Sequence, residues 1–142
     1  MITTPRWWLS AVVLAAMLLA CSGHDVRPIG KIAEMSRTDF FRALRWKQYQ
    51  AAAHFMAPEF RQDFIDRFSA FRDDLHISDV RLVNLQTSED GRRFETTVEM
   101  DYTLLPSIQL KTFVFDQTWV DQYGEGNSGQ GFQIVTPFPE FP

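Results

Sequence analysis

Cys21 and Asp116 are the two side chains whose sequence neighbours most suggest chemistry. Cys21 carries the only thiol of the 142-residue chain, and it stands where an apolar run, residues 7–20, gives way to polar residues. A thiol in such a place is a nucleophile open to covalent modification. Asp116 lies inside an apolar and aromatic segment, residues 113–119, where burial would raise the pKa of its carboxyl and suit it to proton transfer.

The residues around Cys21 resemble the lipobox of bacterial lipoprotein signal peptides. Residues 18–22 read Leu-Leu-Ala-Cys-Ser, Arg6 supplies a positive start, and the apolar run is shorter than the roughly 18 residues that a bilayer-spanning helix needs. The resemblance implies that residues 1–20 are a signal peptide, that Cys21 carries acyl chains such as palmitate, and that these chains hold the protein in a lipid bilayer. The alternative is a buried N-terminal helix with a core cysteine, although the run has no polar face.

The residue after the cysteine indicates which membrane would hold the anchor. With Ser22 after the cysteine, the chain resembles lipoproteins that are sorted to the outer membrane. We therefore expect the protein to be anchored at the periplasmic face of that membrane, with the inner membrane as the alternative. With Cys21 acylated, no thiol remains for disulfides, thiolate metal sites or cysteine catalysis. The formal net charge of −4 and the scattered basic residues exclude a typical nucleic-acid binder.

Three segments are expected. They are a signal peptide over residues 1–20, a lipidated N-terminus and tether over 21–35, and a single domain over 36–142. Ser36 and Asp39 have the spacing of a capping box and predict a helix start. Pro58 predicts a second helix start, and the apolar positions that follow form a phenylalanine stripe typical of a core face: Phe60, Phe64, Phe68 and Phe71.

From His76 onward the apolar period changes to two, which predicts strands. A change of face between Leu82 and Val83 suggests a β-bulge in the first strand. Residues 94–104 alternate cleanly, residues 108–122 form a long strand, and residues 132–136 a last one. The prolines of residues 137–142 prevent a central strand, so Phe138 and Phe141 are expected to seal the domain or, as the alternative, to anchor a partner.

Helices followed by an antiparallel meander of about four strands predict an α+β fold, with the helices packed on one face of a curved sheet. Residues 43–53, 117–119 (Gln-Thr-Trp) and 131–135 (Gly-Phe-Gln-Ile-Val) resemble small bacterial lipoproteins with a cystatin-like or nuclear transport factor 2-like domain. Enzymes of the second group use an aspartate, histidine or tyrosine inside a cone between helices and sheet. The resemblance therefore implies four candidate pocket residues: Asp116, Tyr102, Tyr49 and His54.

The register of the hairpin near residue 106 decides where Asp116 points. A three-residue loop that pairs Leu104 with Ile108 puts Asp116 on the core face. A two-residue loop that pairs Leu105 with Ile108 turns Asp116 outward. We prefer the second register, because it places the larger apolar side chains, Phe113, Phe115 and Trp119, on the core face. This register argues against catalysis by Asp116.

These observations predict a membrane-anchored periplasmic lipoprotein that is not an enzyme and that binds an envelope protein or a small apolar ligand. The alternatives are an enzyme of the ketosteroid-isomerase or dehydratase type, or a carrier with a pocket between helices and sheet. No metal is expected, because His24, His54 and His76 lack ligand spacing. No cofactor is expected either, since the glycine-rich residues 124–129 lie between two strands and open no helix.

Overall fold

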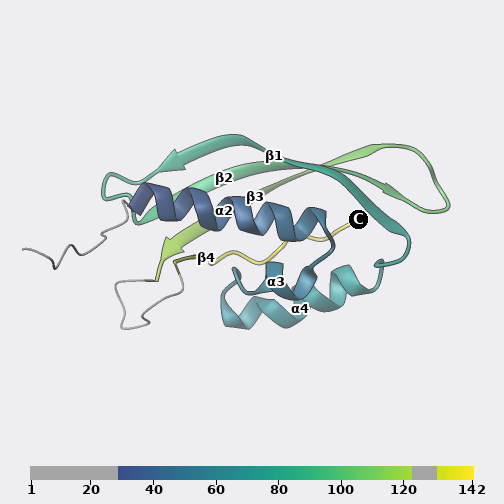
Figure 1. Cartoon of the computed structure of the whole chain (residues 1–142), viewed down its shortest axis with the longest axis horizontal. Helices are drawn as coiled ribbons and strands as arrows, with labels where there is room; N and C mark the ends of the chain where they lie inside the picture. Colours follow the sequence, from purple (N-terminus) through teal and green to yellow (C-terminus); the bar gives the residue numbers. More distant parts are fainter. Residues whose placement is uncertain (1–28, 123–130) are drawn as a thin grey trace, which may run out of the picture.

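The computed structural model describes residues 29–122 and 131–142, in which three helices precede a four-stranded antiparallel sheet (Figure 1). The helices are α2 (Ile29–Arg45), α3 (Tyr49–Ala53) and α4 (Pro58–Ser69). The strands are β1 (Leu75–Thr87), β2 (Arg93–Leu104), β3 (Lys111–Asp121) and β4 (Phe132–Ile134), and they lie in the order β1-β2-β3-β4. The α+β prediction is confirmed. Cys21 and residues 124–129 lie outside the described residues.

Helix α2 begins earlier than the sequence predicts. It starts at Ile29, so the last part of the predicted tether, residues 29–35, is helical. Ser36 does not cap the helix but is buried within it, where a Cβ on Gly131 would come within 3.1 Å of the Ser36 hydroxyl oxygen. Ile32 and Ala33 extend the apolar face of α2 against the core, and this packing holds the extra turns.

Helix α4 begins at Pro58, as predicted, because proline fixes a helical φ and its missing N–H would have no partner in the first turn. Within the phenylalanine stripe, Phe64 and Phe68 are fully buried, whereas Phe60 and Phe71 are only partly buried. Figure 1 shows α2 lying along the sheet, with α3 and α4 beside it. The three helices therefore cover one face of the sheet and leave the other open.

The strand pairing confirms two predictions and corrects a third. The register of β1 against β2 shifts between Leu82 and Asn84, which is the predicted bulge. In β2 and β3, Val98 lies opposite Phe115, the register that the two-residue loop predicts. The loop itself is longer, because pairing stops at Lys111 and residues 105–110 belong to no strand.

The C-terminal tail, residues 135–142, leaves β4 and returns along the inner side of the sheet. Phe138 and Phe141 are only 4% and 5% exposed. Their rings contact Phe68 of α4, with centroid distances of 5.1 and 5.5 Å. The prediction that the tail seals its own domain is confirmed.

Candidate functional site

Asp116 lies on the open, outer face of the sheet. It is exposed, and Thr97 on the neighbouring strand donates a hydrogen bond to its carboxylate, with the oxygens 2.7 Å apart. The residues next to it in β3, Phe115 and Gln117, point to the other face and are buried. Asp116 is therefore turned away from the cone between helices and sheet, as the preferred register predicts.

The other candidates are divided between the cone and the surface. Tyr102 lies on the inner face of β2, and its ring meets Phe141 edge-on at a centroid distance of 4.8 Å. Tyr49 opens α3 and packs against Phe68 at 5.0 Å. His54 follows α3 and is exposed. The structure thus brings the two tyrosines to the helix-sheet interior and leaves His54 and Asp116 outside it.

The Tyr49 hydroxyl is buried and has no hydrogen-bond partner among the described residues. Burial raises the pKa of this hydroxyl above its ordinary value of 10.0, and the Arg72 guanidinium, 6.0 Å from the ring centre, opposes part of that shift. The folded state therefore favours the neutral phenol. Its contribution to stability is present below the unfolded pKa and is lost as the pH rises through the folded pKa.

Tyr49→Phe is expected to keep or increase stability at neutral pH, by up to about 1 kcal/mol, because it removes a buried oxygen that lacks a partner. The variant should also lose less stability than the natural chain above the usual tyrosine pKa of about 10. Denaturant unfolding at neutral and alkaline pH measures both effects. A clear loss of stability at neutral pH would show that the hydroxyl makes a bond essential to the fold.

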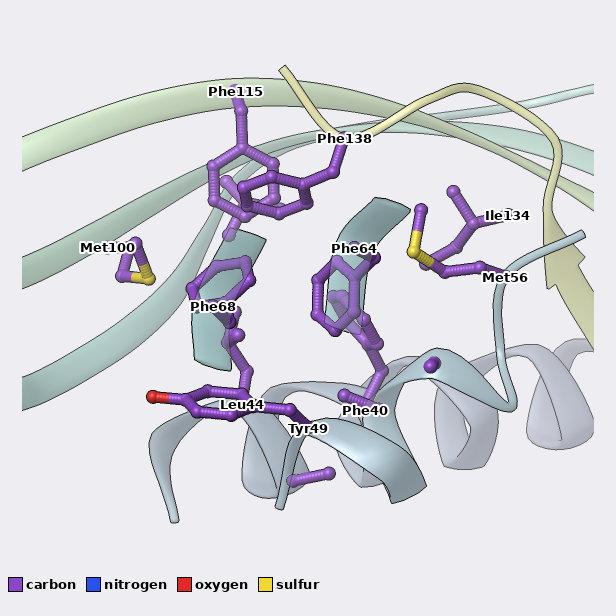
Figure 2. Close-up of a cluster of buried hydrophobic side chains, with 14 of the residues drawn as sticks. Phe40, Leu44, Tyr49, Met56, Phe64, Phe68, Met100, Phe115, Ile134 and Phe138 are labelled. Carbon is purple, nitrogen blue, oxygen red and sulfur yellow. The ribbon is translucent and has the colours of Figure 1, made fainter. Parts of the chain in front are cut away.

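The interior of the cone is filled by the protein's own side chains (Figure 2). Phe138 reaches from the tail to the space between α4 and β3, where its ring lies 5.4 Å from Phe64 and 4.8 Å from Phe115. Phe141 closes the neighbouring space against Phe113 and Tyr102. The tail thus occupies part of the space in which the resemblance places a pocket.

Gln117 is a buried polar residue that the sequence analysis did not single out. It is 3% exposed on the inner face of β3, and both polar atoms of its side-chain amide lack a hydrogen-bond partner in the described structure. Thr96 lies opposite it and accepts a hydrogen bond from the Trp119 indole at 3.3 Å. The preferred register could have revealed Gln117, because it alternates with Phe115 and Trp119. Buried amides without partners are rare in folded proteins.

The open face of the sheet carries a polar depression of about 260 Å³ next to Asp116. Its lining includes Asn84, Glu95 and Thr118. Further along this face, Arg81 forms ion pairs with Glu99 and Asp101. Hydrogen bonds from Arg81 and Thr112 hold the pKa of Asp101 below its usual range. The described polar groups around Asp116 and Asp101 are therefore hydrogen-bonded or ion-paired with one another on this face.

Within residues 29–122 and 131–142, no helix has the length and apolar character needed to span a bilayer. The same ranges hold no group of three or more histidine, cysteine, aspartate or glutamate side chains arranged to bind a metal ion.

Two solved structures have an architecture similar to that of this domain. The structure is similar to the crystal structure of a putative polyketide cyclase from Xanthomonas campestris pv. campestris, with a TM-score of 0.53 and 13% identity over 76% of this chain and 88% of that one. A second similar structure is the intermembrane space region of the chloroplast protein ARC6, with a TM-score of 0.44 and 15% identity over 75% of this chain and 92% of that one. No family model matches the sequence, and no curated protein matches it.

The domain has a nuclear transport factor 2-like fold, as predicted. The prediction that the chain is not an enzyme is wrong, because a solved structure with this fold is described as a putative polyketide cyclase. That prediction relied on the expected lipid anchor and on the catalytic motifs that the sequence lacks, and neither of these excludes an enzyme. At 13% identity the similarity shows the fold and assigns no reaction.

Proposed function

We propose that the chain is a lipid-anchored lipoprotein of the bacterial envelope, with its domain acting as a binding module at the membrane surface. The observation that carries this proposal is the position of Cys21, the only thiol, at the end of the apolar run and before Ser22. Acylation by more than one chain gives stable attachment, since burial contributes about 0.8 kcal/mol per methylene. Ser22 favours the periplasmic face of the outer membrane.

The start of the domain is compatible with such an anchor. Helix α2 begins at Ile29, so the chain between it and Cys21 can span at most about 29 Å. An acylated Cys21 would therefore keep the domain within that distance of the bilayer, where it would meet other envelope components at high local concentration. Because aromatic side chains fill the cone, we place the binding surface on the outside of the domain.

Cys21→Ala is expected to abolish incorporation of labelled palmitate when the full chain is expressed in a diderm bacterium. The variant should also keep residues 1–20, because cleavage before the cysteine depends on its modification. Ser22→Ala is the matched control, and it should still take up label because its thiol is intact. Label in the Cys21→Ala protein, or none in the natural chain, would contradict the lipoprotein proposal.

A second candidate function is binding of a small apolar ligand inside the cone. The specific observation in its favour is Gln117, whose buried amide lacks a partner and could hydrogen-bond a polar group of such a ligand. The ligand would have to displace Phe138 and Phe141. Hydrophobic ligands that stabilise the chain only after residues 137–142 are deleted would support this candidate, and Gln117→Leu should then weaken their effect.

A further inference from the structure

The loop between β2 and β3 exposes three large aliphatic side chains. Leu105, Ile108 and Leu110 are 51%, 89% and 61% exposed, and Ile108 is the most exposed of the large hydrophobic residues described. Figure 1 shows this loop projecting beyond the end of α2. We call residues 105–110 the apolar tip. Exposed aliphatic side chains grouped on one projecting loop are typical of a surface that contacts a membrane or another protein.

A hollow with cationic and aromatic side chains lies next to the base of the apolar tip. Trp46, which is 69% exposed, lines a hollow of about 340 Å³ together with Arg45, Lys47 and His76. The hollow adjoins the tip, because His76 pairs with Thr103 and the Leu105 amide donates to the Asp74 carbonyl.

Four cationic side chains lie at this end of the domain. Asp73 and Asp74 lie among these cations, whereas the next acids along the strands, Asp79 and Asp101, are paired with Arg81. The exposed or half-exposed cations are Arg45, Lys47, Arg72 and Lys111. The Lys47 ammonium donates to the Arg72 carbonyl at 3.0 Å, which keeps two of these residues together. The apolar tip is therefore a projecting aliphatic loop with cationic side chains near the point where it joins the sheet.

We infer that the apolar tip is a second membrane contact, which inserts shallowly into a bilayer containing anionic lipid. Aliphatic side chains, a neighbouring tryptophan and surrounding Lys or Arg are the features that hold peripheral segments at a membrane interface. Each cation near an anionic surface strengthens the attraction of the domain to the membrane. A single short loop is small for a stable protein interface, which buries about 800 Å² per partner.

The inference rests on the proposed function, because the lipid anchor supplies the local concentration that makes a weak contact effective. The start of α2, where the anchored segment joins, lies at the opposite end of the domain from the tip (Figure 1). Helix α2 has 17 residues and a length of about 26 Å. Contact at both ends would lay the domain along the bilayer and fix which faces it presents to other molecules.

A tryptophan reporter at the tip tests this inference in the lipidated full chain. In a Trp46→Phe background, Ile108→Trp leaves the buried Trp119 as the other tryptophan downstream of Cys21. The protein is reconstituted into vesicles of phosphatidylethanolamine and phosphatidylglycerol, with or without brominated acyl chains. We expect the reporter emission to shift to the blue and to be quenched by bromine. Val83→Trp in the same background, on the edge strand, should remain unquenched.

Leu110→Glu in the reporter protein should reduce the bilayer-inserted fraction about tenfold or more, because burial of one aliphatic side chain is worth at least that factor. Unquenched reporter emission, or quenching that Leu110→Glu leaves unchanged, would overturn the inference. A reporter shielded from water but not quenched would also overturn it and would indicate a protein partner at the tip. If palmitate labelling fails, the same reporter chain is added to vesicles from solution, so the tip and the anchor are judged separately.

Discussion

Deletion of residues 137–142 should lower the melting temperature by roughly 10–25 °C. The deletion removes Phe138 and Phe141, which are buried against α4 and β3, and each buried phenylalanine contributes about 1.5–3 kcal/mol relative to an exposed one. A domain of this size has a total stability of about 5–15 kcal/mol, so the loss is large. Thermal unfolding followed by circular dichroism measures it.

Glu140→Ala is the matched control for the deletion, because Glu140 is an exposed tail residue between the two phenylalanines. Its melting temperature should stay close to that of the natural chain. Unchanged stability of the deletion variant would contradict the sealing role, and a simultaneous loss of crosslinked envelope proteins would assign the tail to docking instead.

Trp119→Ala should reduce the free energy of unfolding by about 3–5 kcal/mol. The side chain is fully buried and stacks on Phe94, with ring centroids 5.4 Å apart, while its other neighbours include Phe40 at 5.7 Å. The indole N–H also donates to Thr96. Removal of the ring would therefore leave a cavity at the contact between α2 and the sheet, and denaturant unfolding should show it.

Asp116→Ala, on the same strand, is the control for the tryptophan variant. Asp116 is exposed, and its hydrogen bond from Thr97 lies at the surface, so the change should stay within about 0.5 kcal/mol. If Asp116→Ala destabilised the domain more than Trp119→Ala, the observed register of β2 and β3 would be wrong.

The sequence predicted the faces of the strands well, because the side-chain period of two links every residue of a strand to its neighbours. Once the large apolar residues of β3 were placed on the core face, the outward turn of Asp116 followed. The bulge near Val83 was visible as a change of apolar face. Pro58 marked the start of α4, since its backbone preference is local.

Features that depend on tertiary contacts were not predicted. Helix α2 extends back to Ile29 because its first turns pack on the core, whereas Pro28, Gly30 and the polar residues nearby gave the segment the composition of a tether. The length of the loop at residues 105–110 also escaped prediction, since the register fixes which residues pair but not where pairing stops.

The candidate site was predicted only in part. Tyr49 and Tyr102 were named from the resemblance, and both lie in the helix-sheet interior, but the sequence did not show that Phe138 would lie across α4 and β3. Gln117 was missed because, in the sequence, an amide between aromatic residues indicates a strand but not whether the amide is buried. Whether its side chain finds a hydrogen-bond partner depends on how the core packs.

Mass spectrometry of the intact protein purified from membranes shows whether Cys21 is the acylated first residue of the mature protein. We expect a chain that begins at Cys21, lacks residues 1–20, and is heavier than its unmodified mass by more than one acyl chain. An N-terminus at Met1, or a mature chain with a free Cys21 thiol, would rule out the proposed lipoprotein.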